Sequence, residues 1–261
     1  MPYKREAQNL SVGFDRRIRL AWLDRTAEIV GEALHATRPG ESPDPAALSA
    51  VRAALHRALA GEIQGTDARH KTVNILTRIW LRVPKAHCAM RDEALSLWSQ
   101  VPDAGRLWLH WGMALLAYPF FRDVVTTVGR LLRSQDRFTL AQVQRELVAR
   151  WGERTTLDYA ARGVISSLVD WGVLTLGDGR GIYQGTSTRI SPHPELSVWL
   201  IEATLRSFSD TTLYLYSLLY FPSLFPFQLD IRLSQLHTSS RLLILHGEGN
   251  EPLVTLRKMQ N

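Results

Sequence analysis

The sequence has a single cysteine, Cys88, among its 261 residues. One thiol cannot form a disulfide within the chain, and it cannot supply a metal cluster made of cysteines alone. Such scarcity of cysteine is typical of a reducing compartment, and the first fourteen residues contain no apolar run of the kind that a signal peptide needs. We therefore expect a cytoplasmic protein that is not exported.

The sequence also lacks a hydrophobic run long enough to cross a membrane. Its most apolar stretch, residues 213–227, is interrupted by Pro222 and Pro226, and it falls short of the roughly 20 residues that a spanning helix requires. We expect no membrane partner. The stretch is instead interpreted as core, or as a surface that docks another subunit or a second copy of the chain.

Lysine is scarce as well, because only four of the 31 basic residues are lysines and the rest are arginines. The net charge is +6 and the isoelectric point is about 9.8, which makes a nucleic acid or another anionic surface a reasonable partner. Two explanations of the arginine excess stay open. Arginine binds phosphate through a two-pronged fork, and a GC-rich genome also favours arginine codons.

Motifs of common enzyme classes are absent from the sequence. It contains no P-loop, nucleophile elbow, HExxH motif or Cys-x-x-Cys pair, and the glycines at 177–181 precede strand-like residues, as in a hairpin tip. His87 and His110 are interpreted as structural residues and not as metal ligands. We expect a protein that is not an enzyme, with no cofactor, no catalytic residue and no metal ligand.

Hydrophobic residues recur at three- and four-residue spacing through the first half of the chain. This pattern predicts helices at residues 14–37, 44–61, 67–83, 86–100, 103–117 and 122–133. The helix at 103–117 is apolar on most sides, which predicts a position in the interior. The fold class is therefore mainly α, with an all-helical bundle domain over residues 1–121.

The next stretch, residues 122–190, changes character. Thr139 is a candidate N-cap for a helix to residue 151, and Thr155 with Asp158 has the spacing of a capping pair for a helix to residue 171. Two short strands, 173–176 and 182–184, follow around the glycine-rich tip. Helix, turn, helix and hairpin is the order of a winged helix-turn-helix with a small β-hairpin wing.

The second helix of this unit has one apolar and one polar side. Its apolar stripe consists of Leu157, Ala161, Val164, Leu168 and Trp171, which leaves Thr156, Tyr159, Arg162, Gly163 and Ser166 on the opposite face. Such a face suits the major groove, which is about 12 Å wide. Arg154, Thr155 and Thr156 would contact phosphate at the helix N-terminus, and Arg180 would do so at the hairpin tip.

A second interpretation of the unit stays open, because winged helices also serve as protein-docking modules. Asp158 and Asp178 place negative charge near the proposed surface, and residues 122–189 hold ten arginines against seven acidic residues. The unit is basic, but not strongly so.

A denser positive segment lies at residues 66–91, where six basic residues oppose Asp67 alone. They are Arg69, Lys71, Arg78, Arg82, Lys85 and Arg91. The first five are predicted to follow the phosphates of a nucleic acid. The competing interpretation is an ordinary solvated helix face.

The last part of the chain, residues 191–261, is predicted to be an α+β extension. Helices are expected at 195–208 and 211–220, and a hairpin is expected from strands at 242–246 and 253–256. Helices followed by a hairpin are compatible with a degenerate second winged helix or with a docking element.

The overall layout resembles the BrxA family of BREX bacteriophage-exclusion systems. The resemblance is carried by residues 66–80 (TDARHKTVNILTRIW), by the apolar segment 108–121 leading into 122–132, and by residues 155–174 (TTLDYAARGVISSLVDWGVL). It covers about residues 10–190 and implies a non-enzymatic, DNA-binding component of a phage-defence operon. We expect double-stranded DNA as the partner, with RNA and other defence subunits as further partners. The alternative is a scaffold subunit or a transcription regulator.

Overall fold

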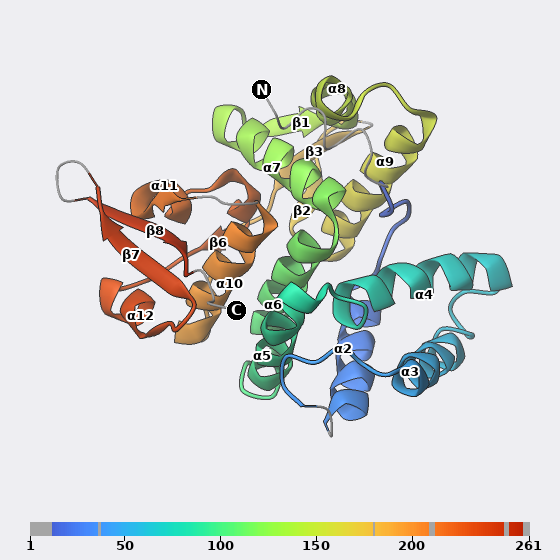
Figure 1. Ribbon diagram of the computed structural model, residues 1–261. Coiled ribbons are helices and arrows are strands. Elements are labelled where there is room, and N and C mark those ends of the chain that lie inside the picture. The colour runs from blue at the N-terminus through green and yellow to red at the C-terminus, as the bar shows by residue number, and fades with distance from the viewer. Residues whose placement is uncertain (1–11, 36–37, 180, 209–211, 248–250, 258–261) are drawn as a thin grey trace.

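The computed structural model describes residues 12–35, 38–179, 181–208, 212–247 and 251–257. The described chain is mainly helical, with small sheets in its second half. Figure 1 shows the helices of the first half at one end of the molecule and the last strands at the other.

The first part of the described chain is helical. Its elements are α2 (Leu20–Leu34), α3 (Pro45–Ala58), α4 (Thr66–Trp80), the 3-10 turn η1 (Lys85–His87), α5 (Cys88–Trp98) and α6 (Asp103–Ala117). Helix α3 begins as predicted, since the Asp44 carboxylate accepts a hydrogen bond from the Ala47 amide and Pro45 occupies the first turn. Helices α2, α4 and α5 all pack against α6.

Helix α6 lies in the interior, as predicted. All its residues from Leu107 to Ala117 are buried, and Trp108 and Trp111 both contact the ring of Phe227 from the C-terminal part of the chain. At Gly112, a Cβ atom would lie 2.3 Å from a ring carbon of Trp199. Only glycine therefore permits this close approach of α6 and the helix that carries Trp199. Helix α6 thus serves as a core element for both ends of the molecule.

The middle of the chain alternates helices and short strands, and we call it the first module. Its elements are α7 (Pro119–Ser134), β1 (Arg137–Thr139), α8 (Leu140–Trp151), α9 (Thr155–Asp170), β2 (Leu174–Leu176) and β3 (Ile182–Gly185). Strands β1 and β2 both pair antiparallel with β3, so the sheet order is β1–β3–β2. The predicted hairpin is confirmed, whereas β1 was not predicted because three residues are too few to reveal alternation.

The two predicted helix caps of this module have different outcomes. Thr139 caps α8 in a capping box: its hydroxyl accepts a hydrogen bond from the Gln142 amide, and the Gln142 side chain accepts one from the Thr139 amide. Thr155 is not a cap. It is the first residue of α9, and the N-cap residue Arg154 makes no capping hydrogen bond with its side chain.

The helix predicted at residues 14–37 begins later than expected, at Leu20. Residues 12–19, which we call the N-terminal segment, are not helical and run along α9. There the Ile18 amide donates to Ser167 Oγ at 2.8 Å, and the Ile18 carbonyl accepts from Trp171 Nε1 at 2.9 Å. Phe14 and Ile18 are buried as the helical pattern requires, but the Ile18 backbone is held by a distant helix.

The remaining elements form the C-terminal part of the chain. They are β4 (Arg189–Ile190), α10 (Pro194–Ser207), β5 (Leu213–Tyr214), α11 (Leu215–Leu219), η2 (Pro222–Leu224), β6 (Phe227–Gln228), α12 (Leu233–Thr238), β7 (Leu242–His246) and β8 (Pro252–Leu256). Strands β4 and β6 pair in parallel, and a second sheet has the order β5–β8–β7. We call α10 to β8 the second module.

The predicted hairpin of this part is confirmed by β7 and β8, which pair antiparallel from Leu242 opposite Leu256. The helix predicted at 211–220 is only partly correct, because residues 213–214 form β5 and α11 covers 215–219. Leu213 pairs with Val254 on β8. A distant strand therefore provides the hydrogen bonds that a longer helix would have made locally, and Thr211 lies outside the described residues.

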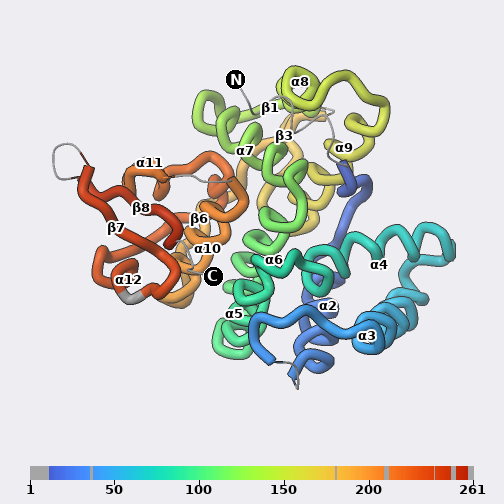
Figure 2. The backbone as a smooth tube through the Cα atoms, viewed as in Figure 1, coloured from blue at the N-terminus to red at the C-terminus, as the bar shows by residue number. Residues whose placement is uncertain are grey.

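The two modules repeat one order of elements: a helix, a strand, further helices and a hairpin. In each three-stranded sheet the first strand pairs with the last, which occupies the centre. Figure 2 shows the second module at one end of the molecule and α3 and α4 at the opposite end, with α6 and α7 between them.

Candidate nucleic-acid interface

The face of α9 that was predicted to contact DNA is open to solvent over most of its length. The exposed or half-buried residues on it are Thr155, Thr156, Asp158, Tyr159, Arg162 and Ser166. Thr155, Tyr159, Arg162 and Ser166 follow one another at three- or four-residue spacing and form one stripe, flanked by Thr156 and Asp158, in which Tyr159 is 67% exposed. The stripe offers hydroxyl groups and one guanidinium, with Asp158 as its acidic member.

Gly163 was predicted to lie on the same face, and this prediction is wrong. Gly163 is buried beneath the N-terminal segment, where a Cβ atom would lie 2.6 Å from the backbone nitrogen of Arg16. The absence of a side chain allows the segment to cross α9 in direct backbone contact. The Leu20 amide continues this contact by donating to the Asp170 carboxylate at 2.9 Å.

The N-terminal segment adds an arginine that sequence reasoning did not select. Arg17 is exposed between Arg16, which touches α9 at Gly163, and Ile18, which is hydrogen-bonded to the same helix. The sequence predicted one helix over residues 14–37 and gave Arg17 no role. Its position beside α9 becomes visible only from contacts across the fold.

The two arginines predicted to contact phosphate at the start of α9 and at the hairpin tip do not add clearly exposed cations to this face. Arg154 is half-buried at the start of α9, and Arg180 at the hairpin tip lies outside the described residues. Next to the tip, Asp178 forms an exposed ion pair with Arg137 at 3.4 Å. This pair reduces the negative charge that Asp178 would present, although such exposed pairs contribute little to stability.

The predicted basic residues of the 66–91 segment differ in how far they are exposed. Lys71, Arg82 and Lys85 are exposed, and Arg78 is half-buried. Arg69 is half-buried too, and it donates to the Ile63 carbonyl at 2.9 Å, which ties it to the preceding loop.

Arg91 contributes nothing to the positive surface, although the charge count of this segment included it. It is fully buried, forms an ion pair with Asp92 at 2.6 Å and donates to the Glu41 carbonyl. The accessible charge of the segment is therefore smaller than its sequence indicates.

Three of the predicted residues converge on one hollow of about 290 Å³ beside α4. Its lining residues are Gly13, Asp15, Lys71, Asn74, Ile75, Arg78, Arg82 and Tyr118. The Arg78 guanidinium lies over the Tyr118 ring at 4.6 Å, in cation–π geometry. Burial raises the pKa of Tyr118, against the opposing charges of Arg78 and Arg82, so its hydroxyl stays protonated.

Arg16 connects this hollow region to α9. Its backbone touches α9 at Gly163, and its side chain donates to the Ala68 carbonyl of α4 at 3.1 Å. Figure 1 shows the N-terminal segment passing from α9 towards α2 on the side of the molecule that carries α4. Helix α9 and the cations of α4 are thus joined through one short segment, which meets α9 at the residue next to Arg162.

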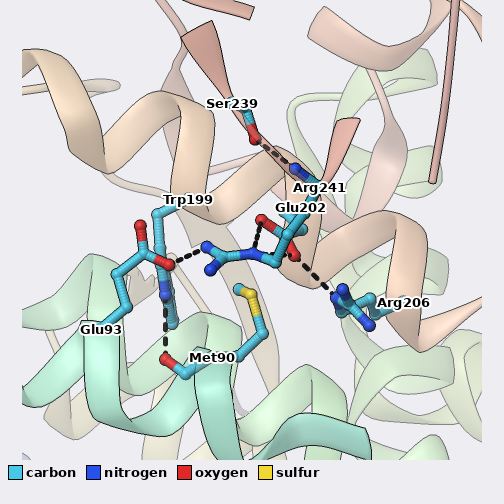
Figure 3. A network of polar contacts seen from close by, with 7 residues as sticks. All are labelled: Met90, Glu93, Trp199, Glu202, Arg206, Ser239 and Arg241. Carbon is cyan, nitrogen blue, oxygen red and sulfur yellow. Dashed lines mark hydrogen bonds and ion pairs between the residues drawn. The ribbon is translucent and has the colours of Figure 1, made fainter. Parts of the chain in front are cut away.

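A separate polar cluster, drawn in Figure 3, lies between α5 and the second module. Glu93 of α5 and Glu202 of α10 both point toward the Arg241 guanidinium, and Arg241 Nε donates to the two Glu202 oxygens at 2.7 and 2.9 Å. Arg241 also pairs with Glu93, and Arg206 Nε donates to Glu202 at 2.8 Å. Burial raises the pKa of Glu93, while Arg241 acts in the opposite direction. The cluster holds the second module on α5.

The apolar stretch at 213–227 is mostly turned inward. Leu218, Leu224 and Phe227 are buried, and residues 219–221 and 224–227 line a cleft of about 680 Å³ against α7 and the base of the β2–β3 hairpin. The most exposed large side chains of the stretch are Tyr216 and Tyr220, at 72% and 60%, with ring centroids 4.8 Å apart. Any docking by this stretch would therefore rely on these rings.

His110 and Cys88, which were considered above as possible metal ligands, both lie in the core. His110 is fully buried, accepts a hydrogen bond at Nδ1 from Trp80 Nε1 at 3.1 Å, and contacts Asp24 through Nε2 at 2.9 Å. Burial lowers its pKa despite Asp24, so the ring is held as a neutral donor to Asp24. His110 is thus a hydrogen-bonded core residue, as predicted, and Cys88 is buried.

The residues that the structure describes contain no group of three or more His, Cys, Asp or Glu side chains arranged to hold a metal ion. Among them, no helix has the length and apolar character needed to cross a membrane.

The chain matches no family model, and no curated protein is similar to it in sequence. Among solved structures it is similar to one described as "SspB crystal structure", with a TM-score of 0.52 and 14% sequence identity. The match covers 97% of this chain and 86% of that chain. At this identity the similarity concerns the fold alone.

Proposed function

We propose that this chain is a non-enzymatic protein that binds duplex DNA, with α9 in the major groove and the cations of α4 on neighbouring phosphates. The order of elements in the first module is that of winged helix-turn-helix domains. In such domains the second helix of the pair presents side chains to base edges while the hairpin and helix ends contact the backbone. Thr156, Tyr159, Arg162 and Ser166 would face the bases.

One observation carries the proposal: Arg16 joins α9, at the residue next to Arg162, to α4. Arg17 and Arg162 are exposed in the same region, and Lys71, Arg78 and Arg82 gather at the hollow. A binding protein that relies on phosphate contacts needs such a continuous run of cations, since each contact releases counterions from the nucleic acid.

A salt titration of binding to a fluorescent duplex tests the proposal. About six phosphate contacts predict that the logarithm of affinity falls with the logarithm of salt concentration at a slope of about −0.9 per contact. A shallow slope would contradict the phosphate contacts, and no binding at low salt would contradict the whole proposal. A single-stranded RNA of the same sequence measures the competing nucleic acid in the same assay.

The resemblance to the BrxA family supports a narrower proposal, a role as a component of a phage-defence system. It rests on the pattern of residues 66–80 and 155–174. Inspection of the gene neighbourhood tests it. Genes for a large ATPase, a methyltransferase and a phosphatase-like protein beside this one are expected, and a solitary gene would favour a transcription regulator.

A second candidate function, docking of another subunit or of a second copy, is favoured by Tyr216 and Tyr220. These neighbouring rings, one on α11 and one directly after it, are exposed, and exposed aromatic side chains are common at protein interfaces. Light scattering of the purified chain, with and without the double substitution Tyr216→Ser and Tyr220→Ser, tests self-association. A monomer in both cases would exclude a self-docking role.

A further inference from the structure

The hollow beside α4 has the chemistry of an anion site. Arg78 and Arg82 line it, and neither has a carboxylate partner among the residues that the structure describes. Arg78 is oriented by the Tyr118 ring, and Arg82 makes one long contact of 3.4 Å to the Asn74 carbonyl. Two guanidinium groups without an ion pair thus line one small concave space, and the carboxylate of its lining, Asp15, is paired with Arg16.

The other polar groups around the hollow are already arranged in favour of an anion. Asp15 is engaged through both carboxylate oxygens by Arg16, at 2.9 and 3.4 Å. Asn74 Oδ1 accepts from Arg52 at 2.8 Å, which leaves its amide N–H groups as donors. Lys71 pairs with Asp67 at 2.8 Å, but both side chains are largely exposed, so this pair yields readily to a ligand.

The path of the backbone at the edge of the hollow requires glycine at position 13. Gly13 has φ +63°, and a Cβ atom there would lie 2.9 Å from a ring carbon of Tyr118. Glycine therefore allows the N-terminal segment to pass over Tyr118 and brings Asp15 to the rim. The concave shape is fixed by three segments of the chain and does not depend on the conformation of a single loop.

From this arrangement we infer that the hollow binds the terminal phosphate of a nucleic-acid strand. An internal phosphodiester carries one negative charge, whereas a phosphomonoester carries about 1.5 to 2 at neutral pH. The two uncompensated guanidinium groups match the larger charge, and their forks suit the oxygens of one phosphate. The inference rests on the proposed function, because it assigns a ligand to part of the same surface.

Competition binding to the full chain separates the inference from the proposed function. The probes are a closed dumbbell duplex without ends and linear duplexes of the same sequence that end in 5′-hydroxyl, 5′-phosphate or 3′-phosphate groups. One phosphorylated duplex is expected to bind about tenfold more tightly than the hydroxyl form, the effect of one additional charge-assisted contact. The dumbbell is expected to bind like the hydroxyl form.

Substitutions identify the hollow as the origin of this preference. The double substitution Arg78→Gln and Arg82→Gln is expected to abolish the tenfold difference and to leave dumbbell binding weaker but measurable. Arg82→Gln alone, at an exposed position, is expected to reduce the difference and serves if the double variant does not fold. Arg57→Gln, at an exposed position on α3, is the matched control and is expected to change nothing.

Three results would overturn the inference. The first is equal affinity for the phosphorylated and hydroxyl duplexes. The second is an undiminished preference for the phosphorylated duplex in the folded Arg82→Gln variant. The third is competition by free AMP or inorganic phosphate as strong as that by a phosphorylated strand. The last result would assign the hollow to a small phosphate compound. Failure of the dumbbell to bind would instead contradict the proposed function and leave the end preference to be judged by itself.

Discussion

In the first module α9 is 16 residues long, whereas α12, which takes the corresponding place in the second module, has six. Residues 122–189 contain ten arginines against seven acidic residues, and residues 191–261 contain five basic against six acidic ones. The two modules repeat an order of strands and helices and yet differ in the balance of charged residues in their sequences. Fold and charge are therefore separate properties of this chain.

The two modules also resemble each other in how their first helix is held. Asp123 on α7 is buried, accepts a hydrogen bond from Trp151 and forms ion pairs with Arg122 and Arg150. Glu202 on α10 is buried in the same way beneath Arg206 and Arg241. In the first module these bonds stay within the module, whereas those of the second reach α5 through Arg241 and Glu93. An ion-pair cluster thus joins the second module to α5, in addition to the packing of Trp199 on α6.

The largest expected effect comes from removing the carboxylate on which this attachment depends. Glu202→Ala leaves the Arg241 and Arg206 guanidinium groups without their shared partner, and we expect a loss of about 3 to 5 kcal/mol in the free energy of unfolding. Chemical denaturation measures this loss. Glu195→Ala, at an exposed position on the same helix, is the control and should stay within about 0.5 kcal/mol. Equal effects would show that the cluster is not what holds the module.

The junction between the modules gives the next effect. A Cβ atom at Gly129 of α7 would lie 1.9 Å from the Pro222 carbonyl oxygen of η2, and a backbone atom cannot move aside easily. We therefore expect Gly129→Ala to cost about 3 kcal/mol, the upper end of the usual range for overpacking. Gly61→Ala, with no atom within 4 Å of the added Cβ, provides the contrast in the same thermal unfolding assay.

The difference in surface chemistry predicts an asymmetry in binding. Arg162→Ala on α9 should weaken DNA binding by about 1 to 3 kcal/mol and blur any sequence preference if the side chain touches a base edge. Arg232→Ala, next to α12, should leave binding unchanged. Titration of both variants against a panel of duplexes measures the two effects. An unchanged sequence profile for Arg162→Ala would reduce its role to a phosphate contact, and equal losses would remove the distinction between the modules.

The smallest expected effect is a dependence of stability on pH that arises in the helical bundle and not in either module. Burial lowers the pKa of His87 and His110, which both belong to the bundle. The unfolded chain then binds more protons than the folded chain below about pH 6.5, so stability falls as the pH drops through this value. The slope is at most about 1.4 kcal/mol per pH unit for each histidine. His87→Gln should flatten it, whereas His237→Gln, at an exposed position on α12, should not.

Local signals in the sequence predicted the elements whose hydrogen bonds are local. Thr139 and Gln142 form their capping box three residues apart, and the apolar pattern of residues 103–117 placed α6 in the interior. The stripe on α9 and the spacing of Lys71 and Arg78 on α4 followed from helical periodicity for the same reason.

The features that were missed depend on partners far along the chain. Residues 12–19 bind to α9, β1 pairs with β3, and Glu93 meets Arg241 across 148 residues. Neither periodicity nor charge counting contains such pairings. The predicted site therefore included the cations of the hollow but not Gly13 or Tyr118, which give the hollow its shape.

The N-terminal segment has a consequence for the order in which the molecule is completed. Its hydrogen bonds from Ile18 to Ser167 and Trp171 span 149 and 153 residues. During synthesis the segment emerges long before α9 exists, and closing so large a loop is slow because its entropy must be lost before any contact repays it. We expect Arg16 and Gly163 to meet only in the last steps of folding. A nascent chain would thus carry the cations of residues 16–17 and α4 early and bring them against α9 late.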